Sequence, residues 1–274
     1  MNMAEKKTLH VRILLGFTLV CLLATLFVPA IPQPPEFHQF ADSRAVLGIP
    51  NFLNIITNLL FLVGCIYGLK LLFDPRPGSQ RTLFESQWEA ISYLTFFVGA
   101  GLTSFASMYY HWSPDNASLV WDRLAMTVIF TSFLTIMIAE RINQRIGLAL
   151  LPVFLALGIF SVYYWYQSEL AGMGDLRLYL IIQFLPAPLI LYMLFFMPSR
   201  YSRSSRFGWI LAIYVLAKLS EYFDRQIFEL QHWISGHSIK HILAAFAVFM
   251  LAEMLRCRIP VKRNRQLDSE LDQY

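Results

Sequence analysis

The sequence is poor in charged residues and in cysteine. Only 15% of its 274 residues are charged, against about 25% in a typical soluble domain, whereas 57% are hydrophobic. This composition excludes an ordinary soluble domain and indicates a chain solvated by lipid. The three cysteines, Cys21, Cys65 and Cys257, form no C-x-x-C pair, and each lies in or at the end of an apolar block. We therefore expect no disulfide framework.

The apolar residues fall into blocks of about 20, the length of helix that crosses about 30 Å of hydrocarbon. The blocks lack the alternation of barrel strands, and backbone groups in hydrocarbon must be hydrogen-bonded internally. We therefore predict an all-α polytopic transmembrane helix bundle of about eight spans. The expected spans are 11–30, 52–73, 88–110, 119–139, 147–166, 178–197, 208–228 and 238–256.

The first block has the basic flank of a signal peptide, but it is long enough to span. It is followed by a proline-rich stretch, Ile31 to Pro35, rather than by a cleavage pattern of small residues. We expect a retained anchor. Most of the 22 Lys and Arg residues fall in segments on the side of the N-terminus, which predicts that both termini are cytoplasmic. The net charge of +4 is thereby explained by topology, and we expect no nucleic-acid partner.

Polar residues gather where the predicted spans reach the opposite, outward face. Ionisable groups at membrane depth are costly unless paired, ligated or wet, so such a gathering indicates a functional site. The cluster comprises Asn51, Asn54, Asn58, Ser107, His111, Asp122, Arg123, Lys218, Glu221, Asp224, Arg225, His237, Lys240 and His241.

Two spacings within this cluster suggest a metal site. Ser107 and His111 are four positions apart, and so are His237 and His241, so each pair shares one helical face. Two imidazoles from one helix and a third from a neighbour make the three-ligand set of a catalytic zinc ion, with a fourth position left for water. Neutral imidazole suits zinc, and these motifs contain no thiolate.

Each element also has a purely structural interpretation. His111 alone would be an interfacial or helix-capping residue, and Ser107 could bond back to a carbonyl of its own helix. Asp122 could pair with Arg123 or cap the fourth span, and the three asparagines could tie helix ends together. The remaining histidines are assigned interfacial roles, with His232 as a reserve ligand: His10, His38 and His232.

Ser107-Met-Tyr-Tyr-His111, Asp122 eleven positions later and Gly236-His237-Ser-Ile-Lys-His241 together resemble the alkaline ceramidase family. That family belongs to a wider superfamily of seven-helix membrane hydrolases that includes the progestin and adiponectin receptors. The resemblance implies an N-terminal region with one additional span (1–40), a seven-helix ceramidase-like domain (41–257) and a basic, then acidic, cytoplasmic tail (258–274).

The resemblance also implies the roles of the site residues. His111, His237 and His241 would bind zinc, Asp122 would be the catalytic acid/base, and Ser107 would stabilise the oxyanion. Calcium is possible but doubtful, because the stretch before Asn51 has a single carboxylate, Asp42. The residues expected to surround and support the site are Asn51, Asn54, Asn58, Asp42, Glu221 and Asp224.

The resulting hypothesis is hydrolysis of the amide bond of a ceramide-like or other N-acyl lipid drawn from the bilayer. Zinc-activated water would attack the carbonyl with Asp122 as acid/base, at a site facing periplasm or lumen. Three alternatives remain open: a hydrolase for another lipid amide or an ester, a receptor or sensor that keeps the metal without turnover, and a transporter or structural protein. The acyl chain, the membrane and the oligomeric state stay open.

Overall fold

The structure is a computed structural model that describes residues 2–74 and 83–261, and it is all-helical over that part of the chain. Only two isolated β-bridges occur there, Val46 with Ile49 and Tyr201 with Pro260. The elements are α1 (Met3–Ala24), η1 (Pro35–His38), α2 (Phe52–Ile56), α3 (Leu59–Leu72), α5 (Glu89–Trp112), α6 (Asn116–Arg141), α7 (Gln144–Leu170), α8 (Arg177–Phe184), α9 (Pro186–Phe196), α10 (Arg206–Tyr222), α11 (Asp224–Gln231) and α12 (Gly236–Cys257).

Seven helical segments of the described chain are long and apolar enough to cross a membrane. This confirms the predicted polytopic bundle. Two of the seven are pairs of shorter helices that follow one another, α2 with α3 and α8 with α9. The spans are Ala4–Ala24, Phe52–Leu72, Glu89–Trp112, Asn116–Arg141, Gln144–Leu170, Arg177–Phe196 and Gly236–Cys257.

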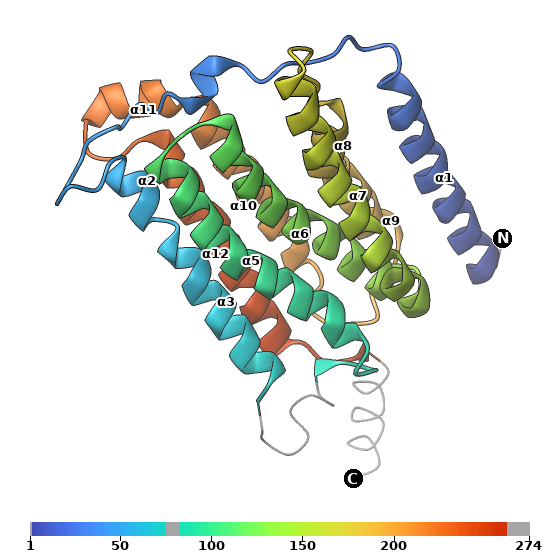
Figure 1. Ribbon diagram of the computed structural model, residues 1–274. Coiled ribbons are helices and arrows are strands. Elements are labelled where there is room, and N and C mark those ends of the chain that lie inside the picture. The colour runs from blue at the N-terminus through green and yellow to red at the C-terminus, as the bar shows by residue number, and fades with distance from the viewer. Residues whose placement is uncertain (1, 75–82, 262–274) are drawn as a thin grey trace.

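The seventh predicted span, 208–228, is shorter in the structure and is not among the seven described segments long enough to cross a membrane. Helix α10 has 17 residues and ends at Tyr222, after which the chain turns and continues as α11. The turn is held by Asp224, whose carboxylate accepts hydrogen bonds from the backbone amides of Ala41 and His237. Helix α11 lies across the end of the bundle, and none of its residues is buried (Figure 1).

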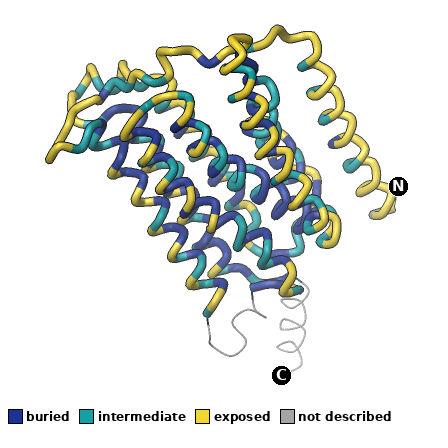
Figure 2. Tube along the Cα trace, in the orientation of Figure 1, coloured by how far each residue is buried: buried dark blue, intermediate teal, exposed yellow. Residues whose placement is uncertain are grey.

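The bundle is built around α5, α6 and α12, whose inward faces carry the core. Helix α5 packs between α3 and α6, and α12 packs against α3 and α10. Fully buried Phe97, Met137 and Leu251 lie at the centre of the core. Figure 2 shows the same arrangement as a dark interior surrounded by exposed outward faces, as expected for helices whose outer surfaces meet lipid rather than water.

Helix α1 stands apart from this bundle (Figure 1). It begins at Met3 rather than at 11 because Asn2 and Glu5 form a capping box. Among its side chains only Leu14 belongs to the core, and the His10 imidazole bonds the Tyr192 hydroxyl at 2.8 Å. Most of its surface is thus left for lipid, which suits the prediction of an additional N-terminal span.

The segment 29–50, here called the strap, runs from α1 across one end of the bundle to α2 (Figure 1). The Ile31 carbonyl accepts a hydrogen bond of 2.9 Å from the Leu176 amide. The Gln33 side chain accepts one from Arg123, and the Arg123 guanidinium stacks 3.9 Å from the Trp165 ring. The strap is therefore fastened to α6, α7 and the start of α8.

A buried ionic network closes the other end of the bundle. Arg258 is only 2% exposed and pairs with the fully buried carboxylate of Glu140 and with the Tyr93 hydroxyl, the latter at 2.7 Å. Its guanidinium carbon also lies 4.0 Å from the Tyr201 ring. Arg258 is the first residue of the expected cytoplasmic tail (258–274), and the structure buries its side chain against Glu140. Of that tail, residues 262–274 lie outside the described residues.

Candidate metal centre

Three histidines meet at the end of the bundle that the strap covers. His111 lies in the last turn of α5, and His237 and His241 lie one turn apart at the start of α12. All three are buried, at 5% exposure or less. The Nε2 atom of His111 lies 3.3 Å from Nε2 of His237 and 3.3 Å from Nε2 of His241, and the candidate ligand atoms all lie within 4.8 Å of one another.

These separations suit a tetrahedral metal ion. Nitrogen ligands at about 2.05 Å from a tetrahedral zinc lie roughly 3.3 Å apart, which matches both separations measured from His111. The prediction that these three histidines come together is confirmed. The close approach of α12 to α10 depends on Gly236, since a Cβ there would meet the Ser220 carbonyl at 2.1 Å.

The hydrogen bonds around His237 and His241 indicate that the Nε2 atom of each of these imidazoles is an acceptor. The Thr57 hydroxyl donates to the Leu53 carbonyl at 2.7 Å, so it accepts at 3.1 Å from Nδ1 of His241. The Asn58 amide lies farther from that nitrogen, at 3.3 Å. The Lys240 ammonium, which has only donors, bonds Nε2 of His237 at 2.9 Å. Both of these Nε2 atoms are therefore acceptors that face His111.

The Nε2 lone pairs of His237 and His241 thus converge on His111. The one on His237 already accepts a hydrogen bond from the Lys240 ammonium. Neutral imidazoles arranged in this way repel one another unless a proton or a metal ion lies between them. The hydrogen bond to Thr57 also fixes the ring orientation and tautomer of His241, which is the role that supporting residues play around metal-binding histidines. The chemistry of the donor set therefore fits a divalent metal that favours imidazole.

Asp122 and Ser107 line the same cavity as His241. Asp122 is 7% exposed, and its Oδ1 atom has no hydrogen-bond partner among the described residues. The Ser107 hydroxyl lies within hydrogen-bonding reach of this carboxylate. Asp122 does not cap its helix, because Asp115 does. Arg123 makes its contacts with Gln33 and with aromatic rings instead. Neither helix capping nor an ion pair with Arg123 therefore accounts for Asp122.

The predicted supporting residues hold the backbone around the histidines. The Asn51 amide donates to the His111 carbonyl at 2.8 Å. Asn54 donates to the Asp42 carbonyl at 3.3 Å and accepts from the Ser238 hydroxyl at 2.6 Å. Asn58 donates to the Asn54 carbonyl at 2.7 Å. These amides join the strap, α2 and α12 at the site.

Two of the predicted supporting carboxylates, Asp42 within the strap and Asp224 beside it, are both engaged by nitrogen donors. Asp42 pairs with Arg44 through both of its oxygens, each at 2.7 Å. This ion pair raises the pKa of Arg44, chiefly through the side-chain hydrogen bond. Asp224 accepts the His237 amide at 2.7 Å and the Ala41 amide at 3.0 Å. Because Arg44 occupies both oxygens of Asp42, the possible calcium site gains no support.

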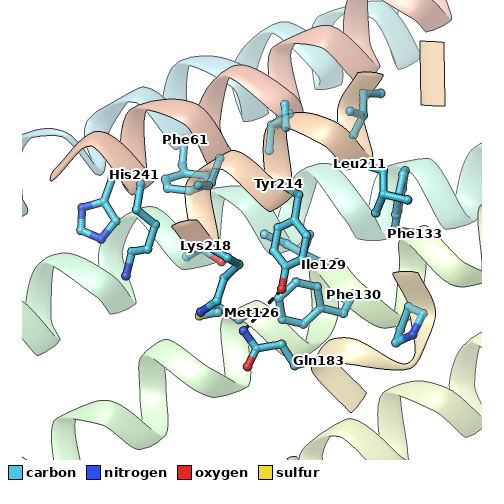
Figure 3. A pocket seen from close by; sticks show the side chains of 18 of the residues that line it. Phe61, Met126, Ile129, Phe130, Phe133, Gln183, Leu211, Tyr214, Lys218 and His241 are labelled. Atoms are coloured by element: carbon cyan, nitrogen blue, oxygen red, sulfur yellow. Dashed lines mark hydrogen bonds between the residues drawn. The ribbon is translucent and has the colours of Figure 1, made fainter. Parts of the chain in front are cut away.

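A cavity opens beside His241 and runs into the bundle (Figure 3). Its polar end is lined by Asn58, Ser107, Asp122, Lys218, Glu221, Lys240 and His241. Its remaining lining is mostly apolar, with Phe61, Phe96, Ile129, Phe130, Phe133 and Ile210 among its members. The arrangement suits an amphiphile whose polar part meets the histidines and whose chain lies among the apolar side chains.

The sequence analysis did not assign a role at the site to three residues that the structure places there. Thr57 was overlooked although it lies between Asn54 and Asn58. Phe40 of the strap packs its ring 4.5 Å from that of His111 and 4.8 Å from that of His237, and no sequence pattern marked it. Lys240 was noted only as a polar residue. The i, i+3 spacing from His237 was the available signal for it.

The other histidines lie apart from the cluster. His38 bonds the Tyr110 hydroxyl at 3.0 Å and the Asn116 side chain at 3.1 Å. His232 ends α11 in a left-handed conformation, and its carbonyl accepts from Arg44. The metal-ligand group found among the described residues contains His111, His237 and His241 and not His232, so the reserve ligand is not needed.

Comparisons of the chain with protein-family models, with curated proteins and with solved structures find no match. The chain is a membrane protein whose histidine end holds a candidate metal centre beside a mostly apolar cavity.

Proposed function

We propose that this protein is a zinc-dependent membrane hydrolase that cleaves the amide bond of an N-acyl lipid, ceramide-like in its general form. The observation that carries the proposal is the convergence of three buried imidazoles at the polar end of an apolar cavity that Asp122 and Ser107 also line. The resemblance of the Ser107, His111, Asp122, His237 and His241 pattern to the alkaline ceramidases points to the same reaction.

Each side chain has a task that its position allows. His111, His237 and His241 would hold zinc, which supplies Lewis-acid polarisation and lowers the pKa of water. Asp122 takes a proton from the attacking water and returns one to the departing amine. Ser107 donates a hydrogen bond to the oxyanion that develops on the carbonyl oxygen, a contact worth about 3 kcal/mol in comparable sites.

The cavity has the length of a fatty acyl chain. Ser107 and Phe96 of α5, Asp122 and Phe133 of α6, and Glu221 and Ile210 of α10 all line it, and each pair is eleven positions apart. At 1.5 Å per residue, each separation is about 16 Å. An extended chain advances about 1.2 Å per bond, so the cavity accommodates roughly 13 bonds.

The proposed orientation puts both termini in the cytoplasm and the histidine end at the periplasmic or lumenal face. The distribution of Lys and Arg supports it. Reporter fusions at the two ends, or labelling of a cysteine introduced at Leu47 of the strap, which is 92% exposed, test this orientation in intact vesicles.

The decisive experiment is an assay of fatty-acid release from a panel of N-acyl lipids, with and without zinc. Asp122→Asn is expected to lower turnover by about 10²–10⁴-fold, the usual contribution of a general acid/base, while zinc content is kept. Asp115→Asn is the matched control, because Asp115 is exposed and caps α6 outside the cavity. Equal turnover of the Asp122→Asn and Asp115→Asn proteins would remove Asp122 from the mechanism.

The same assay separates the remaining alternatives. Release from esters and not from amides would make the protein a lipid esterase with the same site. Zinc binding without turnover of any lipid would favour a receptor or sensor. Neither zinc nor turnover would leave a transporter or structural protein.

A further inference from the structure

A second charged cluster lies in the cavity beside the histidines. Lys218 and Glu221 of α10 form an ion pair, and Lys240 of α12 reaches the same carboxylate at 2.9 Å. All three line the cavity, and their side chains are only 16–32% exposed. Figure 3 shows Lys218 on the same side of the cavity as His241. Two lysines share one glutamate, so the cluster carries one positive charge in excess.

This excess charge is not balanced elsewhere in the cavity once a metal is bound. The charged groups that line the cavity are Lys218, Lys240, Glu221 and Asp122, and as ions they sum to zero. A divalent cation on three neutral imidazoles raises the sum to +2. Burying uncompensated charge away from water is costly, so the loaded cavity favours a ligand that brings negative charge with it.

The position of Lys240 indicates where the negative charge of the ligand would lie. Its Nζ atom lies 2.9 Å from Nε2 of His237, in direct contact with the histidine cluster. A metal at the imidazoles would end that contact and leave the ammonium free to bind a ligand. An anion bound by Lys240 therefore lies within a few bonds of whatever group the histidines hold.

Resting on the proposed function, we propose that the substrate is an N-acyl amino acid, with a carboxylate on the carbon that bears the amide nitrogen. Lys240 binds this carboxylate, and Lys218 supports it from α10. Water adds its hydroxyl to the acyl carbon, the C–N bond breaks, and the nitrogen gains the proton, so that a fatty acid and a free amino acid leave. A neutral head group would leave the excess positive charge of the cavity without a counter-ion. In an N-acyl phosphoethanolamine the anionic group lies one carbon and one oxygen farther from the amide nitrogen, so this lipid tests where the anion is bound.

Equilibrium binding measurements on protein that does not hydrolyse the ligand test the proposed anion site. N-octanoylglycine and N-octanoylethanolamine share the chain and differ in the carboxylate. Isothermal titration into zinc-loaded Asp122→Asn protein, and into chelator-treated wild type, gives the affinity ratio. We expect at least tenfold tighter binding of the acid to the loaded protein, because charge-assisted hydrogen bonds are the strong ones. Equal binding of the two probes, or tighter binding of N-octanoyl phosphoethanolamine, would overturn the proposal.

Variants then locate the anion site. Lys240→Met and Lys218→Met should reduce the preference, and Lys70→Met, which removes an exposed lysine of α3 outside the cavity, should keep it. Glu221→Gln frees both lysines and should strengthen the preference, whereas a merely structural ion pair would only lose stability. A preference that survives both lysine variants contradicts the proposal. If the Lys240→Met protein does not fold, the affinity ratio of the two probes is compared between the wild type and Lys218→Met, and that comparison tests the proposal.

The outcomes also distinguish this proposal from the proposed function. A preference for the acid without hydrolysis of any lipid by the wild type would keep the anion site and remove the amide hydrolase. Hydrolysis of N-acylethanolamines with equal binding of both probes would keep the hydrolase and remove the anion site.

Discussion

The two ends of the bundle both bury polar side chains, yet they do so in opposite ways. At one end, Arg258 meets the Glu140 carboxylate and the Tyr93 hydroxyl, and Arg200 meets Glu89 at 3.1 Å, so unlike charges face each other. At the other, imidazole nitrogens face imidazole nitrogens at 3.3 Å. The first set pairs opposite charges, whereas the second places three candidate metal-ligand atoms within 4.8 Å of one another.

This difference separates residues that stabilise the fold from residues that serve a site. A buried ion pair that loses one partner leaves an uncompensated charge, which is strongly destabilising. A neutral histidine that is removed from the cluster in the absence of metal leaves no uncompensated buried charge behind. Substitutions at the Arg258 end should therefore lower stability, whereas substitutions at the histidine end should lower metal binding and turnover.

The largest expected effect is at the Arg258 end. Glu140→Ala leaves the Arg258 guanidinium buried without its carboxylate, and unfolding in detergent should become easier by about 3–5 kcal/mol. The double variant Glu140→Leu/Arg258→Met removes both charges and should recover much of the loss. An unfolding free energy of Glu140→Ala within about 1 kcal/mol of the wild type would contradict the proposed contrast between the two ends.

At the histidine end, Ser107→Ala should affect turnover and leave stability almost unchanged. Loss of the proposed hydrogen bond to the oxyanion predicts a fall of about 10²-fold, equivalent to about 3 kcal/mol. Ser104→Ala is the matched control, since the Ser104 hydroxyl donates to the Asn58 carbonyl and does not line the cavity. Zinc content should remain that of the wild type. A parallel loss of zinc and turnover would assign Ser107 to metal binding instead.

A smaller effect is expected at Thr57. Thr57→Val keeps the shape of the side chain but removes the acceptor for Nδ1 of His241. Loss of such a supporting hydrogen bond typically weakens metal affinity by about 10–100-fold. Competition with a chelator of known affinity measures the change. Thr103→Val, whose hydroxyl bonds back to the Gly99 carbonyl within α5, serves as control, and equal affinities of the two variants would dismiss the role of Thr57.

The smallest effect concerns the cap of the helix that carries Asp122. The Ser118 amide donates to Asp115 at 2.6 Å, and this hydrogen bond lowers the pKa of the Asp115 carboxyl. Asp115→Ala should cost about 1 kcal/mol. Since the folded pKa lies below the unfolded one, the ionic part of this stability is present above the unfolded pKa and is lost as the pH falls through the folded pKa.

Unfolding curves at neutral pH and below pH 4 test whether the stability contributed by Asp115 falls on acidification. The difference between wild type and Asp115→Ala should shrink toward low pH. Asp115→Asn keeps a capping acceptor and should show only the ionic part of the effect. A difference that grows on acidification would contradict the assignment.

Hydropathy predicted the spans well because the cost of unsatisfied backbone groups in lipid dominates every other term. The histidine pair of α12 was predictable because a spacing of four positions fixes a shared face. His111 and Asp122 were placed by assigning helix ends to one membrane face. Hydropathy, helical spacing and the order of the spans along the chain were sufficient for these predictions.

Other features depend on contacts between distant segments, which no local pattern encodes. Glu140 and Arg258 are 118 positions apart, and their pairing turned a presumed tail residue into a buried one. Phe40 reaches the histidines only because the strap crosses the bundle. The early end of α10 follows from hydrogen bonds that Asp224 makes with two other segments.

The central claim is that the histidine end needs a metal and the Arg258 end does not. The most direct measurement is the zinc content of the purified protein, compared with that of a His237→Ala/His241→Ala variant. The account predicts about one zinc per chain in the wild type, none in the variant, and similar stability of the two proteins after chelation. A wild-type protein that takes up no zinc even when the metal is supplied would contradict it.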